Sequence, residues 1–239
     1  MALPVNATPI YTLNIPSTKK PFKFRPFLVK DEKALLIAQE SDDVSVMLDT
    51  VKDVIKACAK SEIDVENLAS FDIEYIFLQM RSKSIGEIVE LTFACDVDHG
   101  TQNDQARSRV VVNIDDIKVE FPEGHTNNIA LFGDVGVMMK YPTIDTLKRL
   151  EQDVSTTDAA LDIITDCIDY IYDGEQIFTA KDCTKKDLLD FLDNLTSVQL
   201  NNIQNFFRTM PVLRTYIKYT CPVCGLEHNK YMEGLTSFF

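Results

Sequence analysis

The sequence is poor in the residues on which many enzyme signatures depend. It has no tryptophan, and it has only eight glycines and three histidines among 239 residues. A glycine-rich phosphate loop, a dinucleotide fingerprint, a Gly-x-Ser-x-Gly elbow and a His-Glu-x-x-His pair are all missing from it. We therefore expect that the protein is not an enzyme.

Positive charge is scarce as well. Lys and Arg number 24 against 37 Asp and Glu, which gives a net charge of −13. Binding to nucleic acid depends on clustered basic side chains that replace counterions at the phosphates. The charge balance therefore predicts that no nucleic acid is a partner.

Long apolar runs are also missing. None reaches the roughly 18 residues that a transmembrane helix needs. The apolar first residues are interrupted by Pro4 and Pro9 and have no basic region in front of them, unlike a secretory signal. We therefore expect no membrane partner and a reducing cytoplasm, in which the six cysteines are thiols or metal ligands rather than disulfides.

The pattern of residues along the chain predicts an α+β protein with three parts. Residues 1–20 are punctuated by prolines and form an extended arm. Residues 21–140 form a mixed α/β domain, in which an antiparallel sheet packs against helices. Residues 141–239 form a helical region, and a short cysteine-bearing tail with a Cys-x-x-Cys motif packs on it.

Hydrophobic periodicity and capping residues locate the individual elements. Two strands are expected within residues 22–38, around a turn at Lys30–Lys33. Apolar residues at a period of two predict strands at 89–93 and 110–114 and a hairpin around Gly133. Helices are expected at 44–58, 70–82, 141–151 and 158–172, the last ending at Gly174, and after the capping residues Thr184 and Thr196.

The strongest local motif is Cys221-Pro222-Val223-Cys224-Gly225, followed by His228. Two thiolates three positions apart can hold one face of a tetrahedral zinc ion. The other half could be His228 with one further group, or it could come from elsewhere in the chain. Cys95 and His99, four positions apart after a predicted strand, are the best remote candidates, and such a closed Cys3His site would pin the C-terminal part onto the sheet. The candidate metal ligands are Cys95, His99, Cys221, Cys224 and His228.

Two interpretations of these five residues stay open: structural zinc held by a subset of them, and reduced thiols without metal. A redox role is disfavoured because the Cys-x-x-Cys pair is not at a strand-to-helix turn of a βαβ unit. A deaminase-type site would need His-x-Glu and Pro-Cys-x-x-Cys, which the chain lacks. Cys58, Cys167 and Cys183 lie in or beside predicted helices, where we expect them to be inert.

Four segments, taken in order, resemble the baseplate hub assembly proteins of T-even-like contractile-tail bacteriophages. The most specific is the second, Leu-Gln-Met-Arg-Ser-Lys-Ser-Ile-Gly-Glu, and the resemblance extends over about residues 20–239. The segments are Lys23–Leu28 with Glu32–Leu36, Leu78–Glu87, Val137–Pro142, and Cys221–Gly225 with Met232–Phe239.

This resemblance implies a role in building the tail baseplate by protein–protein contact, without catalysis. The implied partners are baseplate hub, tube or tape-measure proteins, with self-association as a further option. The protein would act in the host cytoplasm during assembly and, as a hub subunit, remain in the virion tail baseplate.

Two alternatives accompany this interpretation. The first is a chaperone of tape-measure or tail assembly that is absent from the mature virion. The second is a zinc-stabilised interaction module of another pathway.

Overall fold

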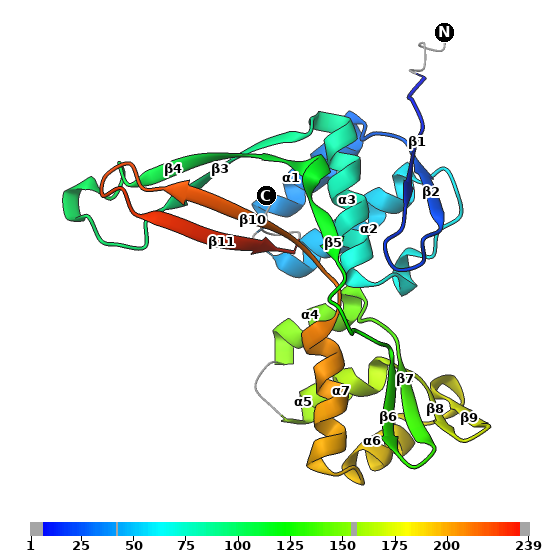
Figure 1. Cartoon of the computed structure of the whole chain (residues 1–239). Coiled ribbons are helices and arrows are strands. Elements are labelled where there is room, and N and C mark those ends of the chain that lie inside the picture. Colours follow the sequence, from blue (N-terminus) through cyan, green and yellow to red (C-terminus); the bar gives the residue numbers. More distant parts are fainter. Residues whose placement is uncertain (1–6, 42, 154–156, 235–239) are drawn as a thin grey trace. The chain divides into compact units, whose positions relative to one another are not determined.

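The computed structural model describes residues 7–41, 43–153 and 157–234 (Figure 1). Over these residues the chain is an α+β protein whose strands form four small antiparallel sheets. Its helices are α1 (Val29–Glu40), α2 (Val44–Cys58), α3 (Ser70–Ile85), α4 (Ile144–Asp153), α5 (Thr157–Asp166), α6 (Lys185–Asp193) and α7 (Ser197–Thr209). Its strands are β1 (Tyr11–Asn14), β2 (Pro21–Phe24), β3 (Ile88–Ala94), β4 (Arg107–Asn113), β5 (Lys118–Glu120), β6 (Asn128–Phe132), β7 (Val135–Met139), β8 (Ile168–Asp173), β9 (Gln176–Thr179), β10 (Val212–Thr220) and β11 (Glu227–Glu233).

The chain divides into two compact units, each assembled from segments that are distant in the sequence. The first unit comprises Met1–Val65, Phe71–Glu120 and Val212–Phe239. The second comprises Glu66–Ser70 and Phe121–Pro211. The strands β10 and β11, which come last in the chain, therefore belong to the first unit together with β3 and β4.

Two long hairpins extend from the helices of the first unit (Figure 1). One is β3 with β4, where Val89 faces Val112, and the other is β10 with β11, where Tyr219 faces His228. The strand order of the second sheet is β11-β10-β5. Alternate side chains of both hairpins meet in one apolar cluster, which includes Val89, Val112, Ile217 and Tyr219 and the fully buried Leu78 of α3.

The helices predicted at 44–58 and 70–82 are present as α2 and α3. The N-terminus of α2 is capped by Asp43, whose carboxylate accepts hydrogen bonds from the backbone N–H groups of Ser45 and Val46 at 2.8 and 3.3 Å. The inward residues predicted for α3 are all buried in the core: Ile73, Ile76, Phe77 and Met80.

The prediction of two strands within residues 22–38 is wrong for the second of them. After β2 the chain forms α1 instead, because Asp31 stabilises the first turn of a helix that begins at Val29. Its carboxylate accepts a hydrogen bond from the backbone N–H of Leu28 at 2.8 Å and pairs with the Arg25 guanidinium at 2.6 Å. A satisfied N-terminus together with an acidic first turn favours the helix.

The second unit pairs the sheet β6-β7-β8-β9 with helices α4 to α7. The hairpin predicted around Gly133 is the β6–β7 hairpin. Both predicted capping boxes are present: the Thr184 side chain caps α6 with Asp187, and the Thr196 side chain caps α7 with Gln199. The core of this unit is apolar and fully buried at its centre, with Val137, Ile168, Leu192, Ile203 and Phe206 among its members.

The single helix predicted at 158–172 is wrong in its second half. Helix α5 ends at Asp166, and β8 pairs with β7 on one side and β9 on the other. Ile168–Tyr172 is rich in β-branched and aromatic residues, which favour a strand once a sheet is there to receive them. Gly174, with a φ of 58°, lies in the turn of the β8–β9 hairpin rather than after a helix.

The prediction of a helical C-terminal part with a short cysteine-bearing tail is also wrong. Residues 141–239 contain the strands β8, β9, β10 and β11 besides their helices, and the cysteines of the tail lie between two long strands. Along β10, Leu213, Ile217 and Tyr219 are buried while their neighbours are more exposed. This alternation is the period of a strand with one buried face.

Candidate metal centre

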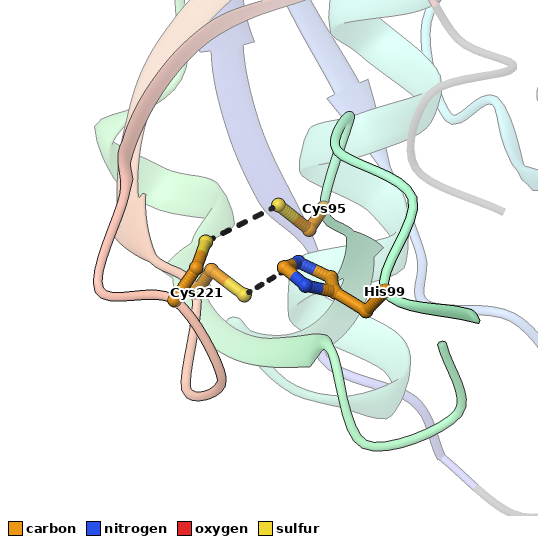
Figure 2. A group of neighbouring side chains, drawn as sticks. Cys95, His99 and Cys221 are labelled. Carbon is orange, nitrogen blue, oxygen red and sulfur yellow. Dashed lines mark hydrogen bonds between the residues drawn. The ribbon is translucent and has the colours of Figure 1, made fainter. Parts of the chain in front are cut away.

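The two cysteine-containing motifs lie at the ends of the two hairpins of the first unit. Cys95 follows β3 directly, and Cys221 follows β10 directly. The two hairpins are joined beside these positions, because Ser108 Oγ donates a hydrogen bond to the Thr220 carbonyl at 2.8 Å and Tyr219 Oη donates to the Ala94 carbonyl at 3.2 Å. Figure 2 shows Cys95 and His99 on one connection, facing the other connection with Cys221.

Four side chains from these two connections bring their donor atoms within 4.8 Å of one another. The Cys95 and Cys224 sulfurs are 3.9 Å apart, and Cys221 Sγ lies 3.6 Å from His99 Nε2. We call Cys95, His99, Cys221 and Cys224 the hairpin-tip cluster. They are four of the five candidate ligands predicted from the sequence.

The connection between β10 and β11 is a tight turn that aims backbone donors at a sulfur. The backbone N–H of Val223 points to Cys221 Sγ at 3.4 Å, and the backbone N–H of Gly225 donates to the Cys221 carbonyl at 2.9 Å. Gly225 has a φ of 72°, which is costly for a residue with a Cβ. The glycine after the second cysteine thus permits the backbone geometry that stabilises a thiolate here.

His228, the fifth candidate, is buried against the cluster rather than within it. Its Nε2 lies 3.2 Å from Cys95 Sγ, and its Nδ1 lies 3.3 Å from the Asp96 carboxylate. Its ring is stacked on Tyr219 at 4.8 Å between centroids, and Tyr219 is stacked on Phe93 at 5.2 Å. The ring is therefore fixed in place between the cluster and the apolar cluster of the hairpins.

Two cysteines of the hairpin-tip cluster, Cys95 and Cys221, have pKa values that shift in opposite directions. Burial raises the pKa of Cys221, but the backbone N–H groups of Cys224 and Val223 and the neighbouring thiols lower it more, to about 6. A backbone N–H from Val97 acts to lower the pKa of Cys95, but desolvation and the Cys221 and Cys224 thiols raise it overall. A thiolate is therefore favoured at Cys221 and disfavoured at Cys95.

Sequence reasoning missed the polar residues that support this cluster. Asp96 contacts His228 and also pairs with the Lys230 ammonium at 3.4 Å. Tyr219 supplies both a stacking surface and a hydrogen bond across to β3. The adjacency of Asp96 to Cys95 was visible in the sequence, but the register that places Tyr219 beside His228 was not.

The other three cysteines lie outside the cluster. Cys58 and Cys167 are buried, and desolvation with a nearby carboxylate raises the pKa of each thiol to about 12. Cys183 is half-buried in the second unit. His125 is a half-buried loop residue that contacts Thr209 and Tyr141, as a loop position predicts.

Chemically, the hairpin-tip cluster offers three soft sulfur donors and one imidazole. That donor set, with all four donor atoms within 4.8 Å of one another, is typical of structural zinc sites. With four protein donors, such a site has no open coordination position for a substrate.

The fold and the cluster define an α+β protein whose first unit has two hairpins meeting at a cysteine-rich end. Comparison with models of protein families matches residues 8–239 to the T4 bacteriophage base plate protein family. The chain therefore belongs to this family, which confirms the baseplate part of the resemblance and gives the protein a structural or assembly role related to the phage baseplate. No curated protein and no solved structure matches the chain. Over the described residues, none of the helices combines the length and apolar character needed to span a membrane.

Proposed function

We propose that this protein is a baseplate hub protein or a hub assembly factor of a contractile-tail bacteriophage, and that it acts by binding other tail proteins. The observation that carries the proposal is the family match over residues 8–239. The match takes in segments of both compact units and both cysteine motifs. What the chain has in common with the family thus extends over the fold and is not confined to a small transferable motif.

The chemistry of the hairpin-tip cluster supports binding rather than turnover. Its four donors come from two different hairpins, so an ion that all four hold would have only protein ligands. Catalytic zinc sites keep a position for water or substrate, whereas closed four-ligand sites stabilise structure. The cluster thus suits a protein that works through binding by its folded surface rather than through catalysis.

The test is capture of partners from infected cells. An affinity-tagged copy of the chain, supplied during infection, is purified under gentle conditions and its partners are identified by mass spectrometry. We expect enrichment of baseplate hub, tube or tape-measure proteins over the same tagged chain produced in uninfected cells. Capture of only those proteins that also appear without infection would contradict the proposal.

Purified virions separate the two forms of the proposal. A hub subunit is present in particles at a fixed ratio to other baseplate proteins, whereas an assembly factor is absent from particles but bound to hub proteins in the lysate. Phages that lack the gene should accumulate incomplete baseplates in either case. Complete, infectious tails made without the gene would refute both.

A further inference from the structure

The geometry points to a new site: we infer that Cys95, His99, Cys221 and Cys224 together bind one zinc ion in a closed tetrahedral site that fastens the two hairpin tips. This inference concerns the first unit alone and does not depend on the proposed function. It stands on the distances among the four donor atoms, on their chemical identity and on the residues around them.

The donor separations are those of ligands on one zinc ion. With Zn–S near 2.3 Å and Zn–N near 2.0 Å, tetrahedral ligands are separated by about 3.8 Å between two sulfurs and about 3.5 Å between sulfur and nitrogen. Cys95 and Cys224 are 3.9 Å apart, and Cys221 and His99 are 3.6 Å apart. Because all four donors also lie within 4.8 Å of one another, a single ion can reach each of them.

The same comparison separates the two histidines. His99 Nε2 lies at a ligand-to-ligand distance from Cys221 Sγ, and it belongs to the group of four. His228 Nε2 is closer to Cys95 Sγ, at 3.2 Å, which suits an N–H donating to a thiolate. His228 is therefore a positioning residue that orients Cys95, and Asp96 in turn holds its other nitrogen at 3.3 Å.

The donor set selects the kind of metal. Three thiolates and one imidazole are soft and borderline ligands, which favour zinc over magnesium or calcium, whose sites are built from oxygen. The N–H of Val223 directed at Cys221 Sγ stabilises the thiolate form that zinc requires. A disulfide would need two sulfurs at about 2.05 Å, far closer than the 3.9 Å between Cys95 and Cys224.

An ion at this position would link parts of the chain that are far apart in sequence. The connection with Cys95 and His99 and the connection with Cys221 and Cys224 belong to different sheets. The strands beside these connections already touch through the Ser108–Thr220 and Tyr219–Ala94 hydrogen bonds. Zinc would add four coordinate bonds to these contacts, and its binding free energy would count toward the folding of the first unit.

The first experiment measures metal content and geometry in the full chain. Protein purified under reducing conditions without chelator is expected to contain one zinc per chain by elemental analysis. After zinc is replaced by Co²⁺, the visible spectrum should show the intense bands of tetrahedral cobalt with thiolate charge transfer. Chelation should lower the melting temperature, and added zinc should restore it. Protein that contains no zinc and binds neither added zinc nor cobalt would overturn the inference.

Variants then test the ligand set. Cys224→Ser is the preferred ligand variant because this side chain is exposed, so the change costs little packing. We expect it to lose stoichiometric zinc and to melt at the same temperature with and without chelator. Cys183→Ser, which removes a cysteine outside the cluster, is the matched control and should keep one zinc.

The two histidines give the sharpest contrast. His99→Gln should abolish stoichiometric binding and change the cobalt spectrum, because a ligand is lost. His228→Gln should keep one metal per chain and a tetrahedral cobalt spectrum, with zinc affinity reduced about 10- to 100-fold, as is typical when a residue behind a ligand is removed. The opposite pattern, with His228→Gln losing the metal and His99→Gln keeping it, would refute the proposed ligands.

Discussion

The first unit contains two polar clusters that include cysteine, one buried and one partly exposed. In one, Cys58 lies near the Arg25–Asp31 ion pair under α1 and α2. In the other, the hairpin-tip cluster, three cysteines and His99 face one another. The pKa of Cys58 is raised to about 12 by desolvation and by the Asp31 carboxylate, whereas that of Cys221 is lowered to about 6 despite its burial.

The two pKa values differ because different groups balance the negative charge in each cluster. Arg25 donates to Asp31 at 2.6 Å and to the Ala57 carbonyl at 3.1 Å, and Asp31 also accepts from the backbone N–H of Leu28. That cluster is complete within the protein, so its thiol stays protonated. The hairpin-tip cluster favours a thiolate at Cys221 but has no Lys or Arg among its four donors, which is the situation that a bound metal ion resolves.

The largest contrast is expected in thiol reactivity. At pH 8 only about one in ten thousand thiols with a pKa near 12 is ionised, so Cys58 and Cys167 should react with iodoacetamide at least about 1000-fold more slowly than unfolded cysteine. Exposed Cys224 should be labelled readily in the presence of chelator and be protected by zinc. Peptide mass spectrometry at timed intervals measures each site. Equal labelling of Cys58 and Cys224 in chelator would remove the contrast between the two clusters.

A smaller but still large effect on the free energy of unfolding is expected when the Arg25–Asp31 cluster under α1 is broken. Asp31→Ala leaves the Arg25 guanidinium buried without its partner and removes the acceptor at the N-terminus of α1. Loss of one member of a buried pair costs about 3–5 kcal/mol of unfolding free energy. Urea denaturation followed by circular dichroism measures this loss.

The matched control is an exposed ion pair of the same unit. Glu120 pairs with Arg214 at 2.5 Å, but both side chains are substantially exposed to solvent. Glu120→Ala is expected to cost no more than about 1 kcal/mol, because surface pairs gain little over hydration. Similar losses for Asp31→Ala and Glu120→Ala would mean that the cluster under α1 is not sealed from water.

The sequence predicted the local features of the fold better than the distant ones. The Asp43 cap and the Thr184 and Thr196 capping boxes depend on residues within one helical turn, so they could be found without the tertiary structure. The strand at 168–173 could not, because its apolar spacing also fits a helix, and only pairing with β7 and β9 decides the outcome. Helix α1 depends on the ion pair between Arg25 and Asp31, and hydrophobic periodicity gives no sign of such a pair.

The candidate metal site shows the same contrast between local features, which the sequence predicted, and distant ones, which it predicted less well. Each half of it was visible as a motif of two donors at short spacing, Cys95 with His99 and Cys221 with Cys224. That the halves meet was a hypothesis from donor chemistry, and the structure brings these four donors together. The position of His228 beside Cys95 depends on the β10–β11 register, so spacing alone could not separate a ligand from a neighbour.

A half-buried polar group in the second unit, around His125, extends the comparison to a weaker case. His125 lies 3.0 Å from Thr209 Oγ1 and 3.1 Å from the Tyr141 hydroxyl, and its ring is stacked on Tyr141 and tilted against Phe206. Its two ring nitrogens thus have neutral partners that a neutral imidazole satisfies. Like the cluster under α1, this site is complete within the protein, but it has no counter-charge.

The smallest predicted effect is the pH dependence that His125 confers. Desolvation lowers its pKa below the ordinary value of about 6.5. As the pH falls through 6.5 toward the lower folded pKa, the unfolded chain takes up the proton first, so this residue makes stability decline with acidification. His125→Gln should reduce the difference in melting temperature between pH 7.5 and pH 5.5 while leaving the exposed carboxylates to contribute equally in both proteins. If the wild type and the variant lose the same number of degrees, the imidazole ring is not desolvated as its contacts indicate, and the parallel with the cluster under α1 does not hold.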